Sequence, residues 1–119
     1  AETIGVGQTA NISSGTHTFT ASAGTAVTAD STAIGSANVI EYTIYISNST
    51  NIQSQKVLIM DNGTTAYIQE YAVMSNPDLI LTFTADVSGG NVRLRATPET
   101  GISGSTTIKF KKKKKQEVT

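Results

Sequence analysis

The single histidine and the carboxylates are the residues of this sequence whose types suit acid–base or nucleophilic chemistry. His17 would need Asp30 and one of the many serines beside it to form a catalytic triad. No nucleophile-elbow pattern of the form Gly-x-Ser-x-Gly accompanies them. One histidine also falls short of the three or four ligands that zinc normally takes. We therefore expect His17 to be an exposed strand residue without a catalytic or metal-binding role.

Two glutamates, Glu41 and Glu70, lie in otherwise apolar, alternating segments and raise the question of an acid/base pair. The same segments predict strands, in which a glutamate commonly pairs with a cation on a neighbouring strand. Such a cross-strand charge pair contributes only about 0.2–1 kcal/mol. We expect Glu41 and Glu70 to pair in this way with Lys56, Arg93 or Arg95, and we expect no enzymatic activity.

The remaining patterns for bound groups are incomplete. Asp61-Asn62-Gly63 resembles the start of a calcium loop, but Ala72 stands where the twelfth-position glutamate belongs. Asn-Gly is also a strong hairpin-turn signal. The segment GVGQTA lacks the third glycine of a dinucleotide fingerprint. The chain has no cysteine. The sequence thus predicts no metal, no cofactor and no disulfide.

The lysines concentrate at one end of the chain. Residues 1–108 carry three basic side chains against eight acidic ones, a net charge of −5, and residues 109–119 carry six lysines against Glu117, a net charge of +5. Consecutive like charges repel, so we expect a flexible tail at 111–119. Two roles remain open for it. Lysines near a strand end discourage edge-to-edge aggregation. Alternatively, they bind an anionic surface such as an acidic protein, DNA or a cell envelope.

Four tyrosines lie in two of the predicted strands, at positions 42, 45, 67 and 71. Some must face outward if the isoleucines of residues 39–47 face inward, and exposed tyrosines suit protein–protein contact. Single-stranded nucleic acids need basic residues interleaved with aromatic rings. The tyrosine-bearing segments are acidic or neutral, so nucleic acid is the less favoured partner and would act through the lysines.

Period-two alternation places these residues on strands. Residues 39–47 alternate throughout, Val57–Met60 and Thr65–Val73 predict a hairpin around Asn-Gly, and residues 79–87 and 92–97 predict a second hairpin around SGGN. Residues 106–110 read as a last strand, and no segment predicts a helix. We expect an all-β fold, an antiparallel β-sandwich that is jelly-roll-like or a small barrel.

The domain organisation follows from changes in composition. Residues 39–110 form the predicted sandwich core, and residues 1–38 are rich in Thr, Ser and Gly with few large apolar residues. We expect 1–38 to be an extended arm with weak strands, 111–119 to be the lysine tail, and the whole to be one domain. No apolar run approaches the length of a membrane span and no signal peptide is recognised, so we expect no membrane association.

Two stretches of residues 39–110 carry a recognisable pattern. The first is VLIMDNGTTAYIQEYAVM, with Asp61, Gly63 and the Tyr67 to Tyr71 segment. The second is TFTADVSGGNVRLRATPE, followed by STTIKF. Together they resemble a small β domain of tailed-bacteriophage structural proteins, especially those of cyanobacterial and marine phages. The resemblance implies a β-sandwich, a place in the virion after assembly in the host cytoplasm, and no catalysis. It leaves the position in the virion open.

Taken together, these observations predict a non-enzymatic virion protein, in the first place a capsid decoration or cement protein. The alternatives are a tail, baseplate or fibre module and a carbohydrate-binding receptor module. Expected partners are the major capsid protein or other virion proteins, and further copies of the chain in a trimer or dimer. The predicted contact residues are Ile4, Ile12, Tyr45, Tyr67, Tyr71, Arg93, Arg95, Lys111, Lys112, Lys113, Lys114 and Lys115.

Overall fold

A computed structural model describes residues 8–117 as eight β-strands. Their bounds are β1 Gln8–Ser22, β2 Val27–Ala33, β3 Val39–Asn48, β4 Asn51–Asp61, β5 Ala66–Asn76, β6 Leu81–Ser88, β7 Asn91–Pro98 and β8 Ser103–Glu117. Within these residues no helix is long and apolar enough to cross a membrane. The predicted contact residue Ile4 lies outside the described residues.

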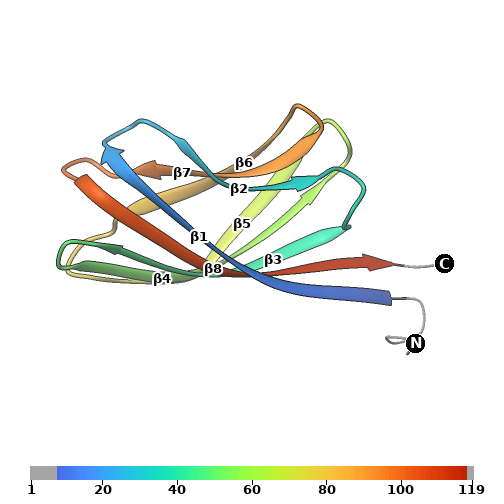
Figure 1. Cartoon of the computed structure of the whole chain (residues 1–119), viewed down its shortest axis with the longest axis horizontal. Coiled ribbons are helices and arrows are strands. Elements are labelled where there is room, and N and C mark those ends of the chain that lie inside the picture. Colours follow the sequence, from blue (N-terminus) through green and yellow to red (C-terminus); the bar gives the residue numbers. More distant parts are fainter. Residues whose placement is uncertain (1–7, 118–119) are drawn as a thin grey trace.

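The strands form two antiparallel sheets packed face to face, as Figure 1 shows. The larger sheet has the order β1-β8-β3-β4-β5, and the smaller has the order β2-β7-β6. This is the predicted antiparallel sandwich, whereas the small-barrel form of the prediction is not adopted, because the strands form two separate sheets. β1 begins where β8 ends, since Gln8 pairs with Glu117.

Alternation of apolar and polar residues explains which side chains fill the space between the sheets. Along β3, Ile40, Tyr42, Ile44 and Ile46 are buried and the residues between them are more exposed. Val57 and Ile59 of β4 and Ile108 and Phe110 of β8 complete the inner face of the larger sheet. Side chains from the smaller sheet pack against them: Ala29, Leu81, Phe83, Val92, Leu94 and Ala96. Burial of one such large side chain contributes about 1.5–3 kcal/mol.

The predicted hairpins are confirmed. β4 pairs with β5, and β6 pairs with β7. The β4–β5 turn is closed by the amide oxygen of Asn62, which accepts hydrogen bonds from the backbone N–H of Thr64 and Thr65 at 3.0 and 2.8 Å. The Asp61 carboxylate accepts from the N–H of Gly63 at 2.9 Å. Asp61-Asn62-Gly63 is therefore a hairpin turn, as its Asn-Gly signal indicates.

The expectation of a flexible tail after Phe110 is wrong. β8 continues to Glu117, and its lysines pair with β1 on one side and with β3 on the other. Neighbouring lysines in a strand point to opposite faces, so lysines on one face are about 7 Å apart. This spacing weakens their repulsion, and backbone hydrogen bonds to two strands hold the segment. Residues of the predicted arm likewise form β1, in the larger sheet, and β2, in the smaller.

One polar cluster joins the sheets beside β8. The Asp30 carboxylate of β2 lies 2.7 Å from the ammonium of Lys112 on β8 and accepts a 2.7 Å hydrogen bond from the hydroxyl of Tyr42 on β3. Burial raises the pKa of Tyr42 far above its ordinary value, and the charge of Asp30 raises it further. Lys112 is buried, and Asp30 offsets the cost of removing its charge from water.

A second polar cluster joins the sheets beside β5. The amide oxygen of Gln53 accepts from the backbone N–H of Ile80 and Leu81 at 2.7 and 2.9 Å. Gln55 donates to the Glu70 carboxylate at 2.9 Å, and that carboxylate also accepts from the N–H of Phe83 at 3.0 Å. These polar groups satisfy one another inside the sandwich, so they fix the pairing of the sheets without leaving unpaired groups there.

Candidate interaction surface

The outer face of the larger sheet gathers exposed apolar side chains from four strands. They are Ile12, Tyr45, Ile52, Met60, Tyr67 and Met74, with exposed fractions of 41% to 66%. Strand registers place all six on this face, because their cross-strand neighbours are also outward-facing residues. We call this face, on β1, β8, β3, β4 and β5, the interaction surface. Exposed apolar groups that cluster in this way mark contact sites.

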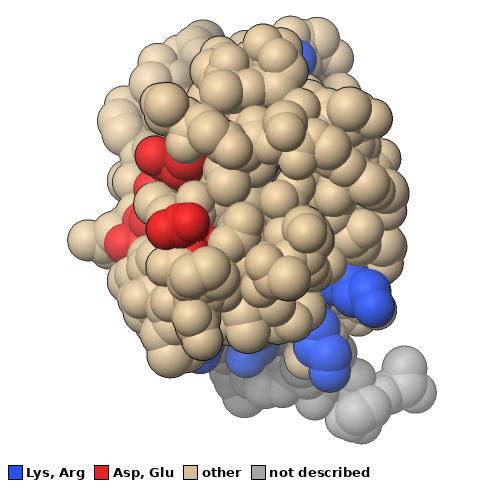
Figure 2. Space-filling model, turned by 90° about the vertical axis from the view of Figure 1, so that its left-hand side faces the viewer, with Lys and Arg blue, Asp and Glu red and all other residues tan. Residues whose placement is uncertain are grey.

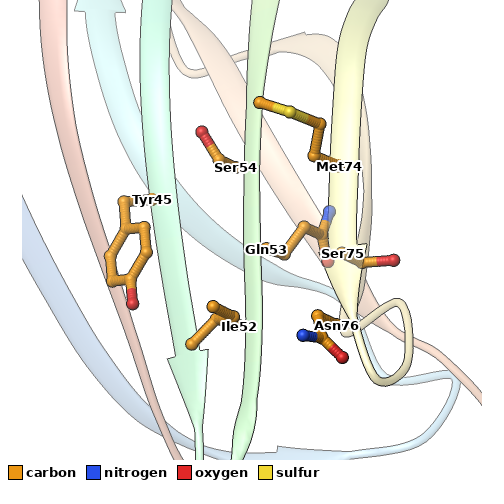
Figure 3. A pocket seen from close by; sticks show the side chains of 7 residues that line it. All are labelled: Tyr45, Ile52, Gln53, Ser54, Met74, Ser75 and Asn76. Atoms are coloured by element: carbon orange, nitrogen blue, oxygen red, sulfur yellow. The ribbon is translucent and has the colours of Figure 1, made fainter.

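One open hollow of the interaction surface lies near the β3–β4 turn, and Figure 3 shows its lining. Tyr45 of β3, Ile52 of β4 and Met74 of β5 come from three neighbouring strands, with Ser54 between them. The rim includes Asn76. An aromatic ring, a branched aliphatic side chain and a flexible thioether form a surface that adapts to an apolar side chain of a partner.

A second open hollow lies at the other end of β4. Its lining includes Val39 of β3, Leu58 and Met60 of β4, and Tyr67 of β5. The register pairs Met60 with Tyr67 directly across the β4–β5 ladder. The phenol of Tyr67 also accepts a 3.3 Å hydrogen bond from the Asn62 amide, which ties the ring to the turn. The interaction surface thus carries apolar groups at both ends of its central strands.

A charged zone separates these apolar groups from the β1 side of the sheet. Lys109, Lys111 and Lys113 of β8 face outward, and Lys113 lies opposite Glu41 of β3. The Glu41 carboxylate accepts a 3.1 Å hydrogen bond from the hydroxyl of Tyr71. Partial burial raises the pKa of Tyr71, and the Glu41 carboxylate raises it further. A polar zone beside apolar hollows is the usual composition of a protein–protein interface.

The segregation of charge is visible on one end of the molecule. In Figure 2, acidic side chains gather on one side, and basic side chains lie mainly along the lower border, which is the side of the larger sheet. The strand register independently puts the three outward lysines of β8 on the outer face of the larger sheet. A partner with acidic groups opposite the lysines would meet complementary charge.

The structure divides the predicted contact residues among several places. Ile12, Tyr45, Tyr67, Tyr71, Lys111 and Lys113 lie on the interaction surface, and alternation along β8 puts Lys115 on the same face. Lys112 instead points inward to Asp30, and Lys114 has the same parity as Lys112. The prediction of a tail with freely accessible lysines is therefore wrong. The lysines of β8 form two sets, one on the outer face of the larger sheet and one on its inner face.

The two predicted arginine contacts lie on the other side of the sandwich. Arg93 and Arg95 project from the outer face of β7, where Val92, Leu94 and Ala96 point inward. Arg93 makes two hydrogen bonds of 2.7 Å to the Asp86 carboxylate, and these bonds lower the pKa of Asp86. Arg95 donates to the hydroxyl of Thr28 at 2.6 Å. Both arginines brace the smaller sheet, and neither joins the interaction surface.

The acidic residues that suggested acid–base chemistry are separated by the sheet. Glu41 points outward from β3, whereas Glu70 points between the sheets toward Gln55 and Phe83. The predicted salt bridges of these glutamates are wrong: Glu41 accepts a hydrogen bond from Tyr71, and Glu70 accepts hydrogen bonds from the uncharged Gln55 amide and the Phe83 N–H. His17 is half-buried and stacks on Phe19 at 5.5 Å between ring centroids. Among residues 8–117 no cluster of metal-ligating side chains occurs.

Sequence reasoning missed part of the interaction surface. Val57–Met60 read as a uniformly apolar central strand, yet Leu58 and Met60 share the outward parity of Lys56. Because lysine seldom points into a core, its position carried the signal that these neighbours face outward. Met74 could not be placed in this way, since a bulge in β5 changes the alternation between Tyr71 and Met74.

Comparison with known proteins identifies relatives of the fold. No family model and no curated protein sequence matches the chain. The tailspike protein of Acinetobacter phage vB_ApiP_P1 is similar over 87% of this chain, with a TM-score of 0.60 and 17% sequence identity. The tailspike protein of Acinetobacter baumannii phage AM24 is similar over 92% of it, with a TM-score of 0.55 and 9% identity. The chain spans 22% and 26% of these two tailspike chains, so the shared feature is a β-sandwich fold that forms part of larger phage proteins.

Proposed function

We propose that this chain is a non-catalytic β-sandwich module of a phage tail appendage, and that its interaction surface contacts a neighbouring virion protein. The fold comparison carries the proposal. Nearly the whole chain resembles part of two phage tailspikes, while occupying about a quarter of each. This relationship is typical of a module that is used within larger assemblies. It agrees with the sequence resemblance to structural proteins of tailed phages.

The comparisons favour the tail module over capsid decoration. Both proteins are tailspikes by description, and neither is described as a head protein. The comparisons therefore support the alternative prediction, a tail, baseplate or fibre module, better than the first expectation of a cement protein on the head shell. The carbohydrate-binding alternative and the expected origin in a cyanobacterial or marine phage stay predictions.

The contact role rests on the outer face of the larger sheet. Met74 and Ile12 are 64% and 66% exposed, values that are costly for large apolar side chains unless a partner covers them. The neighbouring lysines and Glu41 add polar groups that can orient the partner. A non-catalytic role is supported by the separation of Glu41 from Glu70, which prevents the two carboxylates from acting on one substrate.

Immunogold electron microscopy tests the proposed location. Antibodies raised against the purified chain should label the tails of the phage particles that encode it. Antibody pre-absorbed with the same chain serves as the control and should remove the label. Gold particles on the faces or vertices of the head, with none on the tail, would contradict the proposal and would favour a capsid decoration protein instead.

A further inference from the structure

We propose that the free edge of β1 pairs with β1 of a second copy of this chain, in the antiparallel direction. The two larger sheets then join into one continuous sheet across a two-fold axis. The edge of β1 is thus the interface of a homodimer. This dimer does not depend on where in a virion the protein is located.

The four sheet edges differ in how they are protected. β5 carries a bulge, at which Ala72 has a φ of 56° and the register shifts opposite Ser54 and Lys56. β2 has only seven residues and its own register shift between Thr28 and Asp30. β6 has eight residues and bears the charged Asp86. Short length, bulges and charge are the devices by which proteins prevent edge strands from pairing with other chains.

β1 carries none of these devices. It runs for 15 residues, Gln8–Ser22, in unbroken register with β8. Its sequence, QTANISSGTHTFTAS, contains no proline, no lysine or arginine and no carboxylate. In the part of the chain that the structure describes, no strand pairs with the other side of β1. A long, regular and neutral edge is therefore left open on the larger sheet.

A second β1 complements this edge. In an antiparallel ladder, every second residue of an edge strand directs its N–H and C=O away from its neighbour. An identical strand rotated by two-fold symmetry offers the matching acceptors and donors. Because β1 is neutral, self-pairing places no like charges opposite one another. Apolar groups lie on both faces beside the edge, with Ile12 outward and Phe19 toward the core, so pairing also removes apolar area from water.

Two measurements on the purified chain test the pairing. Sedimentation equilibrium should give twice the 12.5 kDa monomer mass and a reversible dissociation on dilution. Hydrogen–deuterium exchange should show slow exchange for consecutive backbone amides along β1 in the dimer. In the diluted monomer, alternate amides of β1 should exchange rapidly while those of β3 and β8 stay protected.

A variant with added positive charge on the β1 edge strand tests whether this edge forms the dimer. Thr16→Lys combined with Thr20→Lys adds two lysines to the exposed side of β1 and should weaken dimerisation at least about tenfold. The matched control, Thr84→Lys combined with Ser88→Lys, adds two lysines with the same spacing to exposed positions of another edge strand, β6 of the smaller sheet. It should leave the dimer unchanged. Circular dichroism and thermal unfolding verify that both variants are folded.

The alternatives give different results. A chain that stays monomeric at all concentrations, or a dimer that resists the β1 lysines but dissociates with the β6 lysines, would overturn the proposal. A trimer would also overturn it, because pairing of one edge with itself is complete at two copies.

Discussion

Gly15 lies directly opposite Phe110 in the β1–β8 ladder, with the phenyl ring against its backbone. A Cβ atom at position 15 would lie 2.4 Å from Cζ of Phe110, well inside van der Waals contact. Glycine is therefore required here for space and not for an unusual backbone angle. The ring of Phe110 occupies the space that a side chain at position 15 would take and covers the backbone of β1 there.

Gly15→Ala should lower the free energy of unfolding by about 1–3 kcal/mol, because either the ring of Phe110 or the β1 backbone must move. Urea denaturation measures the change. Ser14→Ala, on the exposed face of the same strand, is the control and should stay within about 0.5 kcal/mol of the parent. In a chain that already carries Phe110→Leu, Gly15→Ala should lower the free energy of unfolding less than it does in the parent chain, because leucine lacks the ring that the added Cβ would meet. Equal stability of Gly15→Ala and the parent would contradict the close packing.

Tyr42 makes stability sensitive to alkaline pH. Tyrosines of the unfolded chain release their protons near pH 10, whereas burial and Asp30 raise the pKa of Tyr42 in the folded chain. Above about pH 10 the folded state therefore binds more protons than the unfolded state. The free energy of unfolding must then fall as the pH rises, and this contribution is fully present only below the unfolded pKa.

Tyr42→Phe tests this linkage. The variant loses the hydrogen bond to Asp30 and should be about 1 kcal/mol less stable at neutral pH. Between about pH 9 and pH 11 its stability should decline less steeply than that of the parent, since phenylalanine has no proton to release. Urea denaturation at a series of pH values gives both slopes. Identical slopes would show that Tyr42 does not titrate differently in the two states.

At the scale of elements, the bulge in β5 shapes the interaction surface. Ala72 and Val73 together lie opposite Gln55, so Tyr71 and Met74 both point outward although their spacing would place them on opposite faces. Ala72 adopts a φ of 56°, which a residue with a Cβ takes at a cost of about 1–2 kcal/mol. The bulge thereby brings Met74 into the hollow beside Tyr45 and Ile52.

Ala72→Val should destabilise the chain by about 1–2 kcal/mol, because a β-branched residue fits a positive φ poorly. Ala72→Gly should be tolerated, since glycine adopts this angle without steric cost. Thermal unfolding distinguishes the two. If valine and glycine have the same effect at position 72, the bulge geometry is incorrect.

The sequence predicted those elements whose alternation is regular. Residues 39–47 and both hairpins were found because every second side chain is apolar and the turns carry Asn-Gly or Gly-Gly. The end of β8 was missed because a row of lysines has no apolar alternation. Its order depends on β1, β3 and Asp30, which are distant in sequence. Among the contact residues, the tyrosines were predictable from parity, whereas Met74 depends on the bulge.

At the scale of the whole molecule, two polar clusters and an apolar core hold the sheets together, and most of the exposed large apolar side chains lie on one face. Asp30 with Lys112 joins the sheets near β8, and Gln53 with Glu70 joins them near β5. The interaction surface is therefore presented by a braced sheet. Little reorganisation is needed for binding, which favours affinity.

Methionine oxidation in the assembled particle tests the interaction surface most directly. The chain has two methionines, Met60 and Met74, and both lie on this surface with exposed fractions of 52% and 64%. Thr84→Met places a reference methionine on an exposed site of the smaller sheet. Peroxide treatment followed by mass spectrometry gives the rate of sulfoxide formation at each position.

In the free chain, all three methionines should oxidise readily. In the particle, the rates at Met60 and Met74 should fall at least about tenfold, as burial excludes the oxidant, while the methionine introduced by Thr84→Met keeps its rate. Unchanged rates at Met60 and Met74, with protection only at position 84, would contradict the account and move the contact to the opposite face of the sandwich.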